Sequence, residues 1–460
     1  MQPLLVLNAV GLTPRLLPLA PRLSELAAAG SVRPLRDVVP AVTCTVQASI
    51  LTGQPPSVHG IVGNGWLWRD AGEVRFWQQS NRLLQAEPVY ATARRRAKER
   101  NRPFRCAKLF WWFNQGAAVD ISVTPKPYYA ADGNKAFGIS GTPDGLTYRL
   151  EKQLGPFPFH TFWGPKAGLP CTQWIARCAA QVLIDERPDL TLVYLPHLDY
   201  DPQRFGPQGS DLPRLAKELD DACAALLDAA QSVGTRVWVV SEYGHVQVNR
   251  AVLPNRALRK AGLLSVRLGP FGEQLDTFES RAFAVCDHQV AHVYVSDLAD
   301  VVRTRAVLAD LPGVARVLAG DERKELDLIH KRSGELIALS TPDAWFAYPF
   351  WEDDRLAPDY ARTVDIHRKP GYDPCELVFD PKLLWPTGRA AWRLVQKKLG
   401  FRALFDVIPL DPMLVHGSHG LPARDPLDGP VWISDAKEID SALPMTALRD
   451  AILVALDLMN

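Results

Sequence analysis

The chain has 460 residues, of which 47% are hydrophobic and 22% are charged, proportions that are ordinary for a globular protein. This length is sufficient for one large domain with an insert, or for two domains. The 52 basic and 51 acidic residues leave a net charge of +1. Composition therefore gives no indication of a nucleic acid or a membrane surface as a partner.

The cysteines and the hydropathy pattern indicate the cellular compartment in which the protein is expected. The seven cysteines are scattered, their number is odd, and no Cys-x-x-Cys pair occurs, so neither a disulfide framework nor a zinc finger is predicted. No apolar run approaches the roughly 18 residues of a membrane span. No basic segment with a small-residue cleavage site precedes the first apolar run. We therefore expect a protein of a reducing compartment, the cytoplasm.

In the N-terminal third, apolar runs alternate with helical patterns. The predicted elements are a strand over 3–10, a helix over 13–29 that ends at Gly30, helices over 43–51 and 88–100, and a strand over 104–113. Residues 115–170 are rich in Gly, Pro and aromatic residues. This composition predicts ordered loops, which either line one side of a pocket or pack among themselves.

The alternation continues through the rest of the chain and favours an α/β fold, with a mostly parallel sheet covered by helices on both faces. The predicted elements here are a helix over 172–186, a strand over 189–195, a helix over 212–233, a strand over 235–240 and a terminal helix over 445–459. A strand-helix-strand-strand pattern over 291–339 predicts a small α+β insert. We expect a core of residues 1–285 and 360–460, an insert at 286–345, and a return linker at 346–359.

A threonine at a predicted helix start is the first candidate for chemistry. Residues 40–53 read Pro-Ala-Val-Thr-Cys-Thr-Val-Gln-Ala-Ser-Ile-Leu-Thr-Gly, and His59-Gly60-Ile-Val follows. Threonine is a natural helix cap, and the N–H groups and dipole of a helix start attract phosphate. An alkoxide nucleophile needs activation, which metal coordination supplies. The alternative is a capping threonine without chemistry.

This segment resembles the nucleophile segment of the nucleotide pyrophosphatase/phosphodiesterase family, part of the alkaline phosphatase superfamily. The ungapped register puts the nucleophile at Thr43, and a slip would put it at Thr45. The resemblance implies an alkaline-phosphatase-like sandwich and a small phosphorylated, possibly nucleotide-like substrate. It also implies that the threonine attacks phosphorus in line and that water hydrolyses the phospho-threonine. One or two divalent ions are implied, and the ligand types suit zinc or manganese, with magnesium as an alternative.

The family places metal ligands after successive strands, and this chain keeps only part of the set. Asp199 matches the aspartate after strand 189–195, but Gln203 stands where the family has histidine, and its amide oxygen is a weaker ligand. Glu242 retains the carboxylate after strand 235–240. Tyr243 replaces a histidine and ionises only near pH 10, so it is expected to donate a hydrogen bond to a phosphoryl oxygen.

The remaining family positions lie at the two ends of the chain. Val10 stands where the family has an aspartate ligand, and Asn8 lies two residues earlier on the same face of the strand. The last metal ligand of the family is a histidine followed by glycine, near the end of the chain. His419 is the best match to it, and His416 is the alternative. His245 either reaches inward or lies at the surface.

Two clusters lie outside the family motifs. Asp365 and His367 share a face if their segment is extended, and they are candidates to replace lost metal ligands, with a surface turn as the alternative. Asp287, His288 and His292 form the other cluster, for which we expect a structural role; His288 and His292 share a face if they belong to one strand. The predicted substrate contacts are Asn64, Lys108 and Tyr243.

Three functions are compatible with these residues. The first is a metal-dependent hydrolase of phosphodiester or pyrophosphate bonds that uses a threonine nucleophile and a covalent phospho-enzyme. The second is a phosphotransferase or mutase that uses the same threonine. The third is a non-hydrolytic protein that binds a phosphorylated ligand on a degenerate site. The carboxylate and histidine set favours a function that uses a metal.

Overall fold

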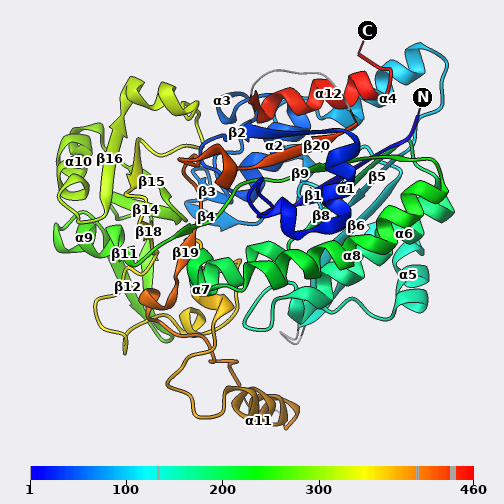
Figure 1. The fold of residues 1–460 in the computed structure, drawn as a ribbon. Coiled ribbons are helices and arrows are strands. Elements are labelled where there is room, and N and C mark those ends of the chain that lie inside the picture. The colour runs from blue at the N-terminus through cyan, green and yellow to red at the C-terminus, as the bar shows by residue number, and fades with distance from the viewer. Residues whose placement is uncertain (1, 132–134, 400, 402, 436–441, 460) are drawn as a thin grey trace.

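A nine-stranded mixed sheet organises the larger part of the chain (Figure 1). The computed structural model describes residues 2–131, 135–399, 401, 403–435 and 442–459. The strand order is β21-β2-β20-β9-β1-β8-β5-β6-β7. Strands β9 to β6 of this order are parallel, whereas β20 and β7 join antiparallel. The strands are β1 (Leu4–Ala9), β2 (Ser31–Arg36), β5 (Cys106–Leu109), β6 (Ile121–Tyr129), β7 (Lys135–Thr142), β8 (Leu190–Leu195), β9 (Arg236–Val240), β20 (Val431–Ser434) and β21 (Leu443–Pro444).

The central strands are apolar because both faces of the sheet are covered. β1 is buried along its whole length, and Asn8 is its only polar residue. It pairs in parallel with β8 from Leu4 opposite Leu190 to Ala9 opposite Leu195. The sheet therefore confirms the predicted α/β fold class, and Asn8 stands near the carboxyl end of the strand.

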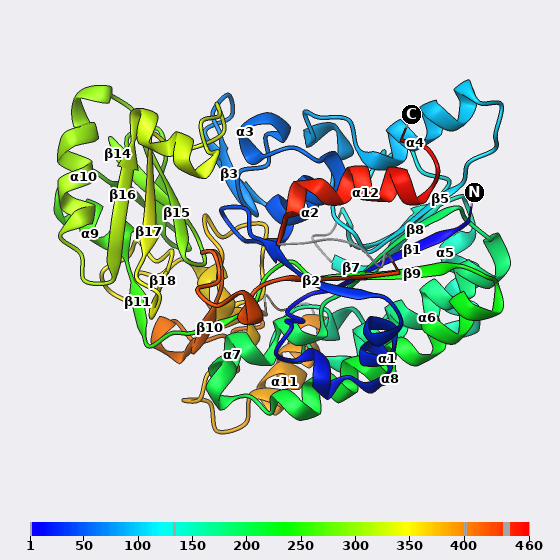
Figure 2. The same ribbon diagram turned by 45° about the horizontal axis from the view of Figure 1, so that its top comes forward.

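Helices lie on both faces of this sheet (Figure 2). Helices α2, α4 and α12 cover one face, and α1, α6 and α8 cover the other. Pairs α6–α8 and α2–α12 pack directly against each other. Their bounds are α1 (Pro21–Ala29), α2 (Thr43–Thr52), α4 (Val89–Glu99), α6 (Leu169–Glu186), α8 (Leu212–Ser232) and α12 (Leu448–Ala455).

A second, four-stranded antiparallel sheet has its own hydrophobic core. Its order is β14-β15-β17-β16, and α9 and α10 pack against it. The elements are β14 (Ala282–Asp287), β15 (Val290–Val295), β16 (Val314–Ala319), β17 (Leu336–Ser340), α9 (Pro254–Lys260) and α10 (Val301–Ala309). The boundary expected at residue 286 falls inside β14, because β14 pairs with β15 along its whole length.

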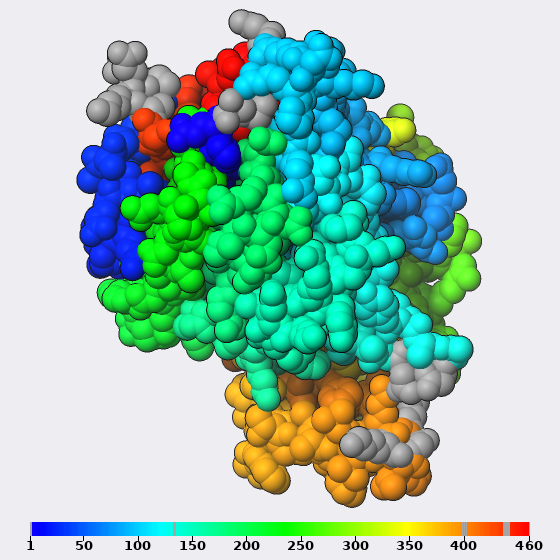
Figure 3. Space-filling view, turned by 90° about the vertical axis from the view of Figure 1, so that its right-hand side faces the viewer, coloured from blue at the N-terminus to red at the C-terminus, as the bar shows by residue number. Residues whose placement is uncertain are grey.

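Short pairs of strands connect the two sheets or project from them. They are β3 (Gly65–Trp68) with β4 (Glu73–Phe76), β10 (Val246–Gln247) with β19 (Gly417–Ser418), β11 (Arg250–Val252) with β18 (Ala344–Phe346), and β12 (Ser265–Gly269) with β13 (Gly272–Asp276). The remaining helices are α3 (Pro56–His59), α5 (Leu146–Leu154), α7 (Asp201–Gly209) and α11 (Pro386–Lys398). Figure 3 shows the orange segment that carries α11 projecting at one end of the molecule.

Several predicted elements differ from the structure. The helix expected over 13–29 begins only at Pro21, after a 3-10 turn at Leu17–Leu19. The loops expected over 115–170 contain the β6–β7 hairpin and α5. Prolines and glycines hid the hairpin. Pro125 and Pro127 lie in the part of β6 beyond its pairing with β5, which ends at Val123, and Gly138 lies in the edge strand β7. Positions that are unpaired on one side tolerate such residues.

Of the aromatic residues in this region, Phe157 packs into the core, whereas Tyr128, Tyr129, Phe137 and Tyr148 are exposed. The rings of Phe110, Phe157 and Trp174 lie 5.0 to 6.0 Å apart in pairs. All seven cysteines are buried as free thiols. Within the described part of the chain, no helix is both long and apolar enough to cross a membrane.

Candidate active site

The candidate site lies beyond the carboxyl ends of the central strands, the usual position in open α/β sheets. Asp199 ends the short turn after β8, and Tyr243 and His245 follow β9. Thr43 is the first residue of α2, a helix whose ten residues are all buried. His419 follows β19, which pairs with β10 and so brings the C-terminal part of the chain to the segment after β9.

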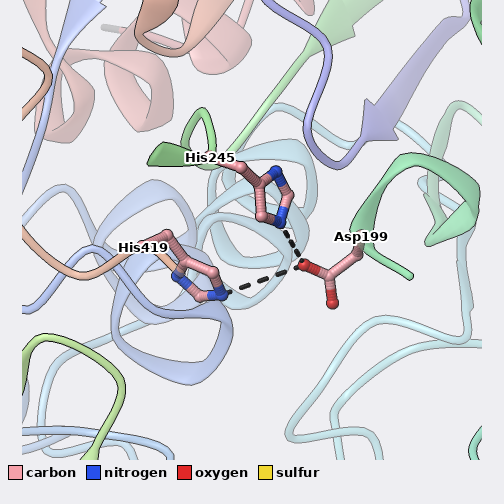
Figure 4. A group of neighbouring side chains, drawn as sticks. All are labelled: Asp199, His245 and His419. Atoms are coloured by element: carbon pink, nitrogen blue, oxygen red, sulfur yellow. Dashed lines mark hydrogen bonds and ion pairs between the residues drawn. The ribbon is translucent and has the colours of Figure 1, made fainter. Parts of the chain in front are cut away.

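Asp199, His245 and His419 form a group that could hold a metal ion (Figure 4). Asp199 Oδ1 lies 3.0 Å from His245 Nε2 and 3.8 Å from His419 Nε2. His419 Nδ1 is 2.7 Å from the carbonyl oxygen of Ala41, so Nδ1 carries the proton and Nε2 keeps its lone pair. Nε2 is buried and has no hydrogen-bond partner among the described residues.

The charge states of the group suit a metal. Burial alone would raise the pKa of Asp199, but the hydrogen bond and charge of His245 bring it below the ordinary value. Burial lowers the pKa of His419 well below that of a free imidazole. The carboxylate is thus ionised and the His419 ring is neutral, which are the forms that bind metals.

Thr43 and Tyr243 share a hydrogen bond beside this group. Thr43 Oγ1 lies 2.9 Å from Tyr243 Oη, and Tyr243 Oη donates to Asp199 Oδ1 at 3.3 Å. Because the single phenolic proton is directed to Asp199, the Thr43 hydroxyl donates to Tyr243. Burial raises the pKa of Tyr243 well above its ordinary value, so the phenol stays neutral. Thr45 lies two residues further into the helix and contacts neither group in the described residues.

Glu242 lies in an amide network instead of facing an open site. Its Oε1 accepts hydrogen bonds from Asn8 Nδ2 at 2.5 Å and from Gln47 Nε2 at 2.7 Å. Burial raises the pKa of Glu242 to about 8, so the carboxyl group is protonated at neutral pH. Val10 offers no ligand atom. Near the position expected for a second ion, Tyr243 is a neutral phenol and so a poor ligand, whereas Glu242 Oε2 and Asn8 Oδ1 are buried oxygens without a hydrogen-bond partner among the described residues.

Stacked rings form a wall behind the three ligands. Tyr243 stacks on His419 with ring centroids 3.6 Å apart, His419 lies 3.7 Å from His288, and His288 stacks on Tyr372 at 3.8 Å. Tyr372 Oη donates to Gln203 Oε1 at 2.6 Å. The amide oxygen of Gln203, the atom expected to bind metal, is thus already engaged, and Gln203 is not part of the group in Figure 4.

Asn64 connects the start of α2 to the second sheet. Asn64 Oδ1 accepts from Cys44 N at 3.0 Å, and Asn64 Nδ2 donates one of its hydrogens to Asp287 Oδ1 at 3.1 Å. Asp287 Oδ2 accepts from Asn64 N at 2.7 Å. His288 lies in the turn between β14 and β15, whereas His292 lies within β15, so the two rings do not share one face of a strand. His292 Nε2 is 2.8 Å from Val62 O.

Asp365 and His367 lie away from the three ligands, because the chain turns over residues 366–368 rather than remaining extended. Asp365 forms an ion pair with Lys135 at 3.2 Å. His367 lines a separate cavity of about 620 Å³ together with Arg75 and Arg368. The residue of segment 365–373 that reaches the site is Tyr372, which stacks on His288.

Lys108, a predicted substrate contact, is buried in the core and bonded there. It is fully buried on β5, and its Nζ donates to Phe113 O at 2.8 Å. Burial lowers the pKa of Lys108 to about 7. No contact in the described residues joins Lys108 to Thr43 or to the three ligands.

Comparison with known proteins identifies the family. The profile of the type I phosphodiesterase / nucleotide pyrophosphatase family matches residues 4–373. The chain belongs to this family. No curated protein sequence matches it.

Solved structures of this kind share the fold at low sequence identity. Phosphonoacetate hydrolase from Sinorhizobium meliloti 1021, in complex with phosphonoformate, has a TM-score of 0.61 at 16% identity, covering 100% of this chain and 96% of that chain. Murine ectonucleotide pyrophosphatase / phosphodiesterase 5 has a TM-score of 0.59 at 13% identity, covering 99% of this chain and 95% of that chain. The likeness confirms the alkaline-phosphatase-like fold, and membership of the family makes this phosphodiesterase-type chain a hydrolytic enzyme.

Three residues of this phosphodiesterase-family site were not among the predicted ligands or substrate contacts. His245 was left between an inward and a surface position, and the structure places it inward on Asp199. His288 and Tyr372 come from segments outside the family motifs, and only the folded chain brings them to His419. The position of His245 shortly after β9 was the one available signal, because side chains after parallel strands converge at that edge.

Proposed function

We propose that the chain hydrolyses phosphodiester or pyrophosphate bonds with Thr43 as nucleophile and one divalent metal ion held by Asp199, His245 and His419. The observation that carries the proposal is His419 Nε2, a buried nitrogen with no partner in the described residues, aimed with His245 at the Asp199 carboxylate. A buried polar atom without a partner costs about 1–3 kcal/mol, so its retention indicates a ligand.

The donor set fits one ion of the zinc or manganese type. One carboxylate and two imidazoles resemble the three protein ligands of catalytic zinc sites, which leave a further position open. When bound there, such an ion supplies Lewis-acid chemistry and neutralises phosphoryl charge. At the position of a second ion, Val10 offers no ligand atom and Tyr243 is a neutral phenol, and we therefore propose a one-ion site.

The chain's own residues orient the nucleophile. The Thr43 hydroxyl donates to Tyr243 Oη, and Tyr243 Oη donates to Asp199, so the lone pairs of Thr43 Oγ1 point away from Tyr243. When Thr43 Oγ1 bonds to phosphorus, the bond from phosphorus to the leaving oxygen breaks, and the proton that Thr43 gives up through Tyr243 Oη ends on the departing oxygen, so Asp199 stays ionised. The positive end of the α2 dipole favours the anionic phosphoryl group at this position.

One further group is placed to hold a phosphoryl oxygen. Asn64 Nδ2 uses one hydrogen on Asp287 and has a second to donate. His288 is not such a donor, because its Nδ1 donates to Asp287 Oδ1 at 2.9 Å and its buried Nε2 keeps a lone pair. We propose that Asn64 donates to the phosphoryl group, and that water then hydrolyses the phospho-threonine.

The substrate that we propose is a small phosphorylated molecule of the nucleotide type. One solved relative of low identity is phosphonoacetate hydrolase with phosphonoformate, and another is an inactive variant of murine ectonucleotide pyrophosphatase / phosphodiesterase 5 with AMP. Both bound molecules are small anions that carry a phosphonate or phosphate group.

Metal content and turnover together test the proposal. We expect about one equivalent of zinc or manganese by elemental analysis, lost in Asp199→Ala, and hydrolysis of a chromogenic phosphodiester that Thr43→Ala reduces by at least about 1,000-fold. Thr45→Ala is the matched control and should keep most of the rate. A Thr43→Ala variant with full turnover, or a metal-soaked protein with less than a tenth of an equivalent, would contradict the proposal.

A further inference from the structure

Helix α11 projects from the rest of the molecule (Figures 1 and 3). It covers Pro386–Lys398 and lies in the segment that links the second sheet to the late part of the core. Both apolar and polar contacts hold it, and Ala390 packs against the small hydrophobic cluster around Trp345 and Val407. Arg389 and Arg393 both pair with Asp406, and Arg393 Nη1 also donates to Gln396 Oε1 at 2.9 Å.

The amphipathic character of α11 is inverted relative to a helix that packs on a core. Ala390, Arg393 and Gln396 are partly buried, whereas the larger apolar side chains of the helix and of its flanking residues are exposed. Trp385 is 73% exposed, Trp392 is 59% exposed and Leu399 is 67% exposed. The exposed apolar side chains of this segment are Leu384, Trp385, Trp392, Leu394, Val395, Leu399 and Phe401.

Trp392, Val395 and Leu399 lie three and four residues apart, so they form one stripe along the helix. Grouped exposed apolar side chains mark an interaction site, whereas single ones are ordinary. The tryptophans add a chemical preference, because Trp combines an apolar ring with a polar N–H and favours the boundary between water and lipid.

The charge of the segment is also unusual for this chain. Residues 381–405 contain six basic residues, Lys382, Arg389, Arg393, Lys397, Lys398 and Arg402, and no acidic residue, although the whole chain has a net charge of +1. Asp406, which follows directly, pairs with Arg389 and Arg393, so the other four give the segment its surplus of positive charge. Lys382 and Lys397 are exposed. An apolar stripe with aromatic residues beside basic side chains is the pattern of helices that lie in the headgroup region of a membrane.

We propose that α11 docks this enzyme on an anionic lipid surface, with Trp385, Trp392 and Leu399 inserted and Lys382 and Lys397 over the headgroups. A second copy of the chain fits the same stripe less well. In a two-fold dimer the patch would face itself, and the basic residues of both copies would then be placed together. An anionic surface complements that charge.

Vesicle flotation tests the proposal directly with the full chain. We expect the protein to float with vesicles of phosphatidylcholine and phosphatidylglycerol at 7:3, and at least about tenfold less with phosphatidylcholine alone, since each basic residue near an anionic surface contributes about fivefold in affinity. Added salt should weaken the binding. Trp385→Ser/Trp392→Ser should lower the bound fraction by at least about tenfold.

A matched control separates this stripe from general surface hydrophobicity. Leu298 and Val302 are 75% and 79% exposed at the start of α10, four residues apart, and Leu298→Ser/Val302→Ser should bind vesicles like the unaltered protein. Thermal unfolding of each variant verifies its fold. Absence of flotation with anionic vesicles would overturn the proposal. So would a concentration-dependent dimer that the tryptophan variant abolishes without any vesicle binding.

Discussion

The hydroxyl of Tyr243 joins the nucleophile to the metal-binding carboxylate, and no other side chain in the described structure makes both contacts. Removing only this oxygen, in Tyr243→Phe, leaves the ring stacked on His419 and takes away the proton path from Thr43. We expect kcat to fall by about 100-fold, the usual contribution of a positioned proton acceptor. The KM and the metal content should change little.

The matched control is Tyr90→Phe, which removes another buried phenolic oxygen, one that accepts from Asn81 Nδ2 at 2.5 Å. This variant should retain the kcat of the unaltered enzyme. Steady-state kinetics with a chromogenic phosphodiester and elemental analysis give the three quantities. A Tyr243→Phe enzyme with unchanged kcat would show that the phenol does not take part in activating Thr43.

Lys108 predicts a pH dependence of stability that is independent of the active site. Burial lowers its pKa from 10.5 to about 7 in the folded protein. Below pH 7 the ammonium is charged in both states, so the folded state bears the full cost of burial. Between pH 7 and 10.5 the unfolded chain binds more protons than the folded one, so the free energy of unfolding rises with pH, by up to about 1.4 kcal/mol per pH unit.

Urea unfolding at pH 6 and at pH 9 measures this effect against Lys108→Met. The unaltered protein should gain about 2–3 kcal/mol relative to Lys108→Met between these two pH values. Lys98→Met, at an exposed position of α4, is the matched control; it retains Lys108 and should respond to pH like the unaltered protein. An identical pH response of Lys108→Met and the unaltered protein would mean that Lys108 stays protonated when folded.

At the scale of elements, α8 caps the start of α1. Ala20 precedes α1 and has no side chain to cap it, and Pro21 lacks an N–H. Asp220 of α8 replaces the cap, since its carboxylate accepts from Arg22 N at 3.2 Å and from Leu23 N at 3.0 Å. Asp220 is 2% exposed, so these bonds are protected from water.

Asp220→Ala should therefore lower the free energy of unfolding by about 1–3 kcal/mol, because it leaves helix-start N–H groups without their acceptor. Asp221→Ala is the natural control. Asp221 is exposed and pairs with Lys217, and loss of such a pair changes stability by less than about 1 kcal/mol. Equal destabilisation of the two variants in urea would contradict the capping role.

The core elements and the edges of the fold differ in how far the sequence predicts them. α2, β8 and α8 lie within a few residues of their predicted ranges, because each has a regular apolar period or a capping residue. The β6–β7 hairpin was missed, since its prolines and glycine lie where the sheet is unpaired on one side, and such positions admit them. The predicted post-strand residue Asp199 lies with His419 because parallel strands end at one edge.

The parts of the site that depend on tertiary contacts were not predictable in this way. His288 and Tyr372 reach the site only because the second sheet and the segment after it fold against the core. Asp365 and His367 were expected on an extended segment, but Lys369 is buried in ion pairs with Asp373 and Glu376 at 2.7 Å, which draws the chain into a turn. No periodic pattern in the sequence signals such a buried ion pair.

At the scale of the whole molecule, the proposed metal site lies where the two sheets meet. The core supplies Asp199, and the turn between β14 and β15 places His288 against His419. Asp287 of the same turn binds Asn64 at the start of α2. A metal ion at Asp199, His245 and His419 should therefore stabilise the folded chain as a whole, because it binds the assembled site and not the unfolded chain.

At a free metal concentration of about 100 times Kd, zinc or manganese should add about 2.7 kcal/mol to the free energy of unfolding. Differential scanning fluorimetry of the metal-stripped protein, titrated with either ion, would show this as a rise in Tm. His419→Ala should remove the rise, since it deletes the unpartnered buried Nε2. His160→Ala, which alters an exposed histidine outside the site, should retain it. A rise that persists in His419→Ala would place the ion elsewhere on the chain and contradict the site.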